Sequence, residues 1–226
     1  MIDAAAAGVG ALYNLGRAYF QRRYTILFYA LVFTVVASPA IASLGLSGAM
    51  IESLLAATLL AAVIPVDVGR GRNFLLAVMT AVWLARPVTA WLGLRILSAM
   101  TLGIWTLIGL FAAAVALRFA LGGGKVDSEH LYAALSAYLL AGVYFGLLYW
   151  VLEQVRPGAF VSADNFSRTS AVYFSFVTLA TVGYGDIVPR TDAARGLAIV
   201  EGVGGQLFLA VLVARLLTLY SKPAGD

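Results

Sequence analysis

Residues 181–186, with the sequence TVGYGD, have the types and spacing to bind a cation through the main chain. Gly183 and Gly185 can adopt left-handed backbone angles because they lack a Cβ atom. Alternating left- and right-handed angles turn consecutive carbonyl groups toward one axis, while the side chains of Val182 and Tyr184 turn outward as packing. Carbonyl oxygens can replace the water around a cation without adding net charge. The segment therefore predicts a cation-binding strand made of backbone.

Other kinds of chemistry have few residues to work with. The chain has no cysteine, which excludes disulfides, thiolate chemistry and cysteine-ligated metals. His130 is the only histidine, so a Ser-His-Asp relay would have to pass through it and a zinc site would need mostly carboxylates. We therefore expect neither an enzyme nor a bound cofactor.

The composition places the chain in a membrane. Of its 226 residues, 62% are hydrophobic and only 12% are charged, and the mean hydropathy is +0.93. A water-soluble chain carries about a quarter charged residues, so most of this surface must face lipid. We attribute the net charge of +4 to membrane topology and not to nucleic-acid binding.

Apolar segments of suitable length predict six membrane-spanning helices, at residues 24–44, 49–66, 73–94, 96–121, 131–155 and 193–220. The first four would form one transmembrane domain, residues 24–121, followed by a linker at 122–130. The fifth helix has an alternative start near Asp127.

The ends of the chain are predicted to lie in the cytoplasm. Residues 1–23 include Arg17, Arg22 and Arg23, and an excess of arginine marks the cytoplasmic side of a membrane. This segment is either an interfacial amphipathic helix or an unstructured tail. Six crossings of the cell membrane would return residues 221–226 to the cytoplasm as a short tail.

Charged residues within the predicted helices do not form a voltage sensor. Such a sensor needs arginines at every third position of one helix, because one charge contributes only about 2.3 kcal/mol per 100 mV. The fourth helix has only Arg118, and Arg86 and Arg95 fall on opposite faces. Glu52 is either an interfacial carboxylate or part of an ion site, and Arg86 is either its partner or a residue that reaches toward the interface.

Residues 156–192, between the last two predicted helices, are too many for a tight turn. Within them, residues 170–180 are apolar but only long enough to cross half a membrane. Irregular backbone at membrane depth is tolerated only where protein encloses it or where it lines a watery path. The segment therefore predicts a re-entrant helix and a pore loop.

Residues 181–186, preceded by Thr178, resemble the selectivity filter of tetrameric potassium channels, and residues 193–217 resemble the inner helix of prokaryotic members with six transmembrane helices. The resemblance implies an all-α integral membrane protein, a homotetramer, and a pore domain at residues 131–220. It also implies potassium sites and supporting side chains around the filter. The ion-binding residues would be Thr181, Val182, Gly183, Tyr184 and Gly185, and the supporting residues Tyr173, Phe174, Thr178 and Asp186.

The last helix would control the pore. The resemblance makes Gly205 a bending point, although glycines there could instead serve close packing. Helical spacing predicts a pore-lining face with an apolar constriction near its end, formed by Gln206, Leu209, Val213 and Leu217. Glu201 is expected near the pore helix, in structural hydrogen bonds and not in ion coordination.

These expectations favour a passive potassium channel that is not strongly voltage-gated. Its partners would be further copies of itself and the lipid bilayer, and the gating stimulus and any regulatory partner stay open. Two alternatives remain: the membrane subunit of a potassium uptake transporter, and a non-conducting membrane adaptor with a relict filter.

Overall fold

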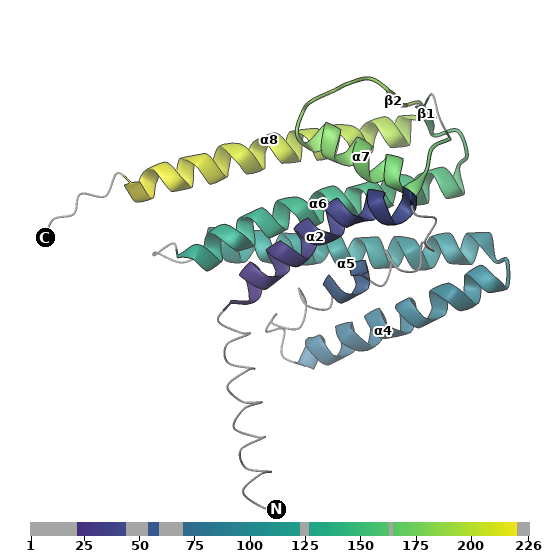
Figure 1. Cartoon of the computed structure of the whole chain (residues 1–226), viewed down its shortest axis with the longest axis horizontal. Helices are drawn as coiled ribbons and strands as arrows, with labels where there is room; N and C mark the ends of the chain where they lie inside the picture. Colours follow the sequence, from purple (N-terminus) through teal and green to yellow (C-terminus); the bar gives the residue numbers. More distant parts are fainter. Residues whose placement is uncertain (1–21, 44–53, 59–69, 123–126, 163–164, 221–226) are drawn as a thin grey trace, which may run out of the picture.

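The structure is a computed structural model that describes residues 22–43, 54–58, 70–122, 127–162 and 165–220. It is mostly helical, with two short strands (Figure 1). The helices are α2 (Arg23–Ser43), α4 (Arg70–Trp91), α5 (Arg95–Leu121), α6 (Ser128–Val155), α7 (Arg168–Leu179) and α8 (Asp192–Tyr220), and the strands are β1 (Phe160–Ser162) and β2 (Ile187–Pro189). Residues 54–58 are also helical.

Four of the described helices are long and apolar enough to cross a membrane. Their apolar spans are Arg23–Ile41, Ile96–Leu121, Ser128–Val155 and Asp192–Leu217. The chain is therefore a multi-pass membrane protein by length and composition, and six crossings remain a prediction. Most of the predicted span at 49–66, including Glu52, lies outside the described residues. The structure describes only residues 54–58 of it.

The predicted third span, residues 73–94, forms most of helix α4. Within it, Leu76–Ala85 is an apolar stretch among the residues whose side chains the structure describes. That α4 crosses the membrane stays a prediction.

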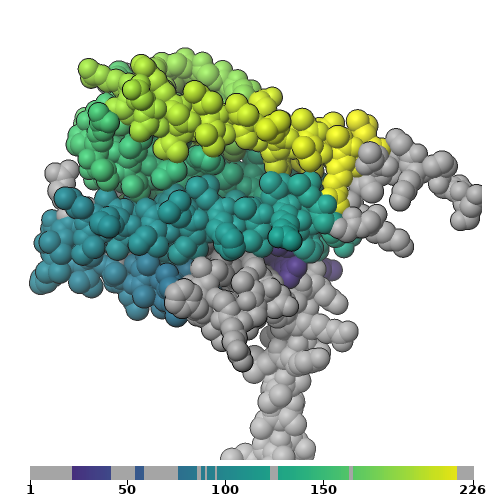
Figure 2. Space-filling view, turned by 180° about the vertical axis from the view of Figure 1, so that it is seen from behind, coloured from purple at the N-terminus to yellow at the C-terminus, as the bar shows by residue number. Residues whose placement is uncertain are grey.

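Helix α6 is the centre of the fold. It packs against α5 along most of its length, and also against α2, α7 and α8, while α4 packs on α5. Figure 1 shows α7 and α8 on one side of α6 and α4 on the opposite side of the molecule. In the view from behind, α8 forms one outer edge and α4 and α5 form the broad lower face (Figure 2).

Close packing between α5 and α6 depends on small residues. A Cβ atom on Gly109 would lie 2.3 Å from the ring of Tyr144, and that tyrosine is fully buried. Gly146 of α6 similarly admits Val172 of α7, whose Cα would lie 2.5 Å from an added Cβ. Small residues let helix backbones approach closely in membrane proteins. They fix α5 and α7 tightly on α6.

The start of α6 confirms the earlier of the two predicted positions. Asp127 is the N-cap of the helix, and its side chain accepts a hydrogen bond of 3.1 Å from the backbone N–H of His130. The His130 ring lies 2.7 Å from the same carboxyl oxygen and, by this side-chain hydrogen bond, lowers the pKa of Asp127 below its ordinary value. The predicted linker at 122–130 is shortened accordingly.

The N-terminal end of α2 is attached to α6 by Glu129. The Glu129 carboxylate accepts hydrogen bonds from the backbone N–H of Tyr24 at 2.9 Å and of Thr25 at 3.3 Å. The Thr25 hydroxyl also donates to it. Amide groups in the first turn of a helix have no partner within that helix, so a carboxylate supplied by α6 satisfies them.

Strands β1 and β2 were not expected from the sequence. They pair antiparallel, with Phe160 opposite Pro189 and Ser162 opposite Ile187. The backbone N–H of Arg190 also donates to the Ala159 carbonyl at 2.8 Å. Three residues in each strand are too few to produce a recognisable alternation, but their pairing brings together the two ends of the segment that contains α7.

Candidate functional site

Residues 181–186, which we call the filter loop, follow directly from α7. The backbone N–H of Thr181 donates to the Thr178 carbonyl at 3.0 Å, and that of Val182 donates to the Val177 carbonyl at 2.9 Å. Beyond these bonds the loop leaves the helix and runs toward β2. Its start is therefore fixed by main-chain contacts to the last turn of α7.

Backbone angles in the filter loop alternate in sign. Gly183 has φ 63° and Gly185 has φ 78°, which is the left-handed conformation expected for both glycines. Thr181 also has a positive φ of 54°, which the sequence did not indicate. A threonine rarely adopts this conformation, and it persists only where surrounding contacts impose it. Two contacts hold Thr181: the hydrogen bond from its backbone N–H to the Thr178 carbonyl, and a hydrogen bond to its hydroxyl from a side chain of α8.

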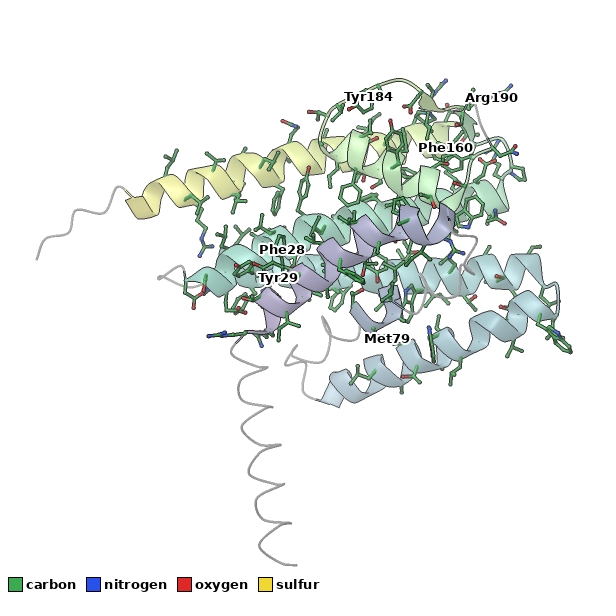
Figure 3. All side chains as sticks on the ribbon, in the orientation of Figure 1. Phe28, Tyr29, Met79, Phe160, Tyr184 and Arg190 are labelled. Carbon is green, nitrogen blue, oxygen red and sulfur yellow. The ribbon has the colours of Figure 1, made fainter. Side chains whose placement is uncertain are left out.

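The filter loop is exposed on the surface of a single chain. The Val182 side chain is 49% exposed and that of Tyr184 is 71% exposed. Figure 3 shows Tyr184 at the outer edge of the molecule, above Phe160 of β1. One loop presents oxygens from one side only, so it cannot surround an ion by itself.

Two tyrosines stack beside the filter loop. The rings of Tyr173 and Tyr184 are parallel within 2°, with centroids 6.4 Å apart. The Tyr173 hydroxyl also faces the carboxyl group of Asp186. The structure thus brings together three of the residues singled out from the sequence, across the end of α7 and the loop.

Phe174 lies elsewhere. Its ring packs edge-on against Tyr149 at 5.0 Å and against Phe160 at 5.5 Å, in a buried aromatic cluster between α6, β1 and α7. Helical geometry explains the difference, because neighbouring residues point about 100° apart on a helix. Phe174 therefore holds α7 on α6, whereas Tyr173 faces the filter loop.

Two adjacent residues of helix α8 contact the start of the filter loop and the last residue of α7. The Gln206 side chain donates to the Thr181 hydroxyl at 3.3 Å. Gly205 is buried, and a Cβ atom there would lie 2.6 Å from the Leu179 carbonyl oxygen. Glycine is thus required at position 205 for close approach to α7. Because α8 is one continuous helix, bending at Gly205 stays a prediction.

The remaining predicted pore-lining residues lie farther along α8. Leu209, Val213 and Leu217 are exposed in the single chain, in register with Gln206 on the helix. Exposure of apolar side chains is compatible with lining a cavity, with lipid, or with contact to another copy. Their role as a constriction therefore stays a prediction.

Glu201 occupies the position expected from the sequence. It is buried, and its carboxyl group bonds to the hydroxyl of Ser175 on α7 and, at 2.5 Å, to that of Tyr149 on α6. Buried polar groups need hydrogen-bond partners, and this was the signal for a contact with the pore helix. The identity of Tyr149 was missed, because 52 residues separate it from Glu201 in sequence.

A second contact of α8 was also missed. The Arg215 guanidinium donates to the Gly122 carbonyl, just after the end of α5, at 2.6 Å. A cation is favoured at the carboxyl end of a helix, where carbonyl groups lack partners. This bond joins the carboxyl-terminal half of α8 to the end of α5.

The described arginines leave the voltage prediction untested. Arg118 lies in the last turn of α5, as expected. The side chains of Arg86 and Arg95 lie outside the described residues, so their predicted partners cannot be compared with the structure.

Comparison with known proteins finds a family match in the carboxyl-terminal part of the chain. Residues 134–222 match the family model described as an ion channel. This segment contains most of α6, both strands, α7, the filter loop and α8. The match supports an ion-channel segment at residues 134–222.

Potassium channels from several organisms are similar to part of the chain. The inward rectifier potassium channel Kirbac3.1 of Paramagnetospirillum magnetotacticum is 34% identical over 38% of this chain and 28% of its own length. Two pore potassium channel c of Oryza sativa subsp. japonica is 37% identical over 39% of this chain and 18% of its own length. A voltage-gated potassium channel of Aeropyrum pernix is 27% identical over 42% of this chain and 31% of its own.

The matches are partial on both sides. The chain covers less than a third of the length of each of these three relatives. No solved structure matches the chain. The similarity therefore describes one segment of this protein and one segment of each relative.

Proposed function

We propose that the chain is the subunit of a potassium-selective channel, in which four copies form one pore and K⁺ passes down its electrochemical gradient. One observation carries the proposal: Gly183 and Gly185 both have left-handed backbone angles in a loop that directly follows a short helix. That backbone can aim consecutive carbonyl oxygens at one axis, which is what coordination of a dehydrated cation needs. The ion-channel family match over residues 134–222 and the similarity of part of the chain to potassium channels support it.

Each residue of the filter loop has a role in this proposal. The carbonyls and the Thr181 hydroxyl would replace the water around K⁺, and the positive φ of Thr181 belongs to the same alternating backbone. Four copies are needed because one exposed loop cannot enclose an ion. The carboxyl end of α7 carries a partial negative charge that favours a cation nearby. The ion-binding residues would be Thr181, Val182, Gly183, Tyr184 and Gly185.

The remaining parts of the proposal concern topology and gating. Both chain ends would lie in the cytoplasm, with Arg17, Arg22 and Arg23 on that side of the cell membrane. Gating would not depend strongly on voltage, because α5 carries only Arg95 and Arg118.

Ion flux into proteoliposomes tests the function. The purified protein is expected to admit K⁺ far faster than Na⁺ and to be blocked by Ba²⁺. Gly183→Ala should abolish selective flux, because a left-handed non-glycine residue costs about 1–2 kcal/mol in each copy. Gly196→Ala is the matched control, since Gly196 of α8 has no positive φ and an added Cβ would contact no atom within 4 Å.

Three results would contradict the proposal. They are equal entry of Na⁺ and K⁺, absence of flux from well-folded protein, and selective flux that survives Gly183→Ala. Flux that requires an energy source would instead favour an uptake transporter.

A further inference from the structure

Glu201 stands at a junction of three helices. Its side chain is only 1% exposed, and those of Tyr149 and Ser175 are completely buried. The Tyr149 hydroxyl donates to Glu201 Oε2 at 2.5 Å. Ser175 Oγ is within hydrogen-bond distance of Glu201 Oε1, and it also lies 2.6 Å from the Gly142 carbonyl oxygen of α6. The cluster joins α8 to both α6 and α7.

The number of hydrogens in this cluster decides the state of Glu201. Ser175 has one hydroxyl hydrogen, and the Gly142 carbonyl can only accept. An ionised Glu201 could also only accept, so one of the two short contacts to Ser175 would have no hydrogen. With a proton on Oε1, Glu201 donates to Ser175, and Ser175 donates to Gly142. Oε2 then accepts from Tyr149, and every contact contains one hydrogen.

The surroundings of Glu201 also favour a neutral acid. In the part of the chain that the structure describes, no ion pair to Glu201 is formed. The adjoining cavity of about 320 Å³, between α5, α6 and α8, is lined by apolar residues apart from Glu201 and Tyr138. A buried carboxylate without a cation is strongly disfavoured. The titratable groups that face Glu201 among the described residues are Tyr149 and Tyr138, both from α6, and both are neutral in their ordinary state.

We propose that Glu201 binds a proton and, as a neutral acid, is a positioning residue that holds α7 and the filter loop against α8. This role rests on the proposed channel function. Glu201 lies one helical turn before Gly205, which packs on Leu179, and Gln206, which bonds to Thr181. Loss of the proton places two acceptors around the single Ser175 hydrogen and loosens the attachment of α7 at this level. K⁺ flux then falls as pH rises, because the conducting arrangement needs the protonated form.

Infrared spectroscopy of the full-length protein in an ester-free detergent tests the proton directly. At neutral pH we expect a carbonyl stretch of a protonated carboxylic acid that is lost in Glu201→Gln. Tyr149→Phe should keep this band but shift it to higher frequency, because the carbonyl loses the hydrogen bond from Tyr149. Absence of the band in folded wild-type protein, or an unshifted band in Tyr149→Phe, would overturn the proposal.

Flux measured against pH tests the positioning role. Wild-type flux should fall between neutral and alkaline pH, and the infrared band should fall over the same range. Glu201→Gln should conduct K⁺ without this pH dependence, because its amide can donate to Ser175 and accept from Tyr149. Glu153→Gln, which changes a carboxylate bonded to Gly158 and Phe160 near the end of α6, is the control and should keep the wild-type profile.

The outcomes separate this inference from the channel proposal. An infrared band that Glu201→Gln removes supports the bound proton even if no K⁺ flux is found. Selective flux with no pH dependence in wild type, or with the same dependence in Glu201→Gln, overturns the positioning role while leaving the channel intact.

Discussion

Helices α6 and α8 have nearly the same length, 28 and 29 residues. The fraction of their residues that other parts of the described chain bury is very different. In the apolar window of α6, 56% of the residues are buried, against 11% in that of α8. Both helices are apolar enough to leave water. Composition therefore indicates that both helices lie in a membrane. Only the packing shows that other helices of the same chain bury about half of α6 but little of α8.

The difference agrees with the proposed assembly of several copies. α6 has α2, α5, α7 and α8 around it, while α8 is held mainly by its contacts with α6 and α7. Most of the apolar surface of α8, together with the filter loop, remains exposed. Lipid can cover an apolar helix, but lipid cannot complete a ring of carbonyl oxygens. Additional copies of the chain would satisfy both regions at once.

The largest effect should come from applying one substitution to both helices. Leu140 of α6 is completely buried, whereas Leu207 of α8 is 61% exposed. Leu140→Ala leaves a cavity, and such substitutions cost about 2–5 kcal/mol in water-soluble proteins. We expect a cost near the lower end of that range, because the leucine side chain of the unfolded state lies in lipid and not in water. Leu207→Ala should leave the stability of the dissociated subunit unchanged and weaken the assembly.

Unfolding in mixed detergent micelles measures the first quantity, and the mass of the solubilised complex measures the second. If Leu207→Ala destabilised a dissociated subunit as much as Leu140→Ala does, the contrast between α6 and α8 would be wrong. If it changed neither quantity, Leu207 would face lipid.

A smaller effect is expected within α8, at two neighbouring glycines. Gly205→Ala would force a Cβ atom to 2.6 Å from the Leu179 carbonyl, whereas an added Cβ on Gly204 contacts no atom within 4 Å. Overpacking costs about 1–3 kcal/mol, and here it would displace the end of α7 and lower K⁺ flux. Gly204→Ala is the matched control. Equal flux in the two variants would show that contact with α7 is not what position 205 provides.

The smallest effect concerns the start of α6. Asp127→Ala should cost about 1 kcal/mol through loss of the N-cap, and Asp127→Asn should cost less because asparagine also caps. The pKa of Asp127 is lowered by His130, so the stability from its charged form is complete above the ordinary aspartate range and is lost as pH falls through the lowered pKa. Unfolding measured against acidic pH should show this loss in wild type and not in Asp127→Asn.

Local features of the chain were predictable from sequence. The left-handed glycines of the filter loop follow from residue type, and the helical segments near 24–44, 96–121, 131–155, 170–180 and 193–220 follow from apolar runs of suitable length. Helix α4 was likewise predicted, at 73–94, and its crossing of the membrane stays a prediction.

Contacts between distant segments were not predictable in detail. Tyr149 meets Glu201, Glu129 meets the start of α2, and Arg215 meets Gly122, each across at least 50 residues of sequence. Phe174 and Tyr173 are adjacent in sequence, yet one packs on α6 and the other faces the filter loop. Spacing says which residues share a helix face, but not which neighbour that face will meet.

The sequence by itself determined that this protein belongs in a membrane and carries a glycine-dependent loop between two long helices, because hydrophobic length and the steric freedom of glycine are properties of residues. Tertiary structure alone decided that about half of α6 but little of α8 is buried, that Gly205 packs against α7, and that Glu201 lies between two hydroxyl groups. These depend on how helices approach one another, and that approach is set by the fit of side chains from distant parts of the chain.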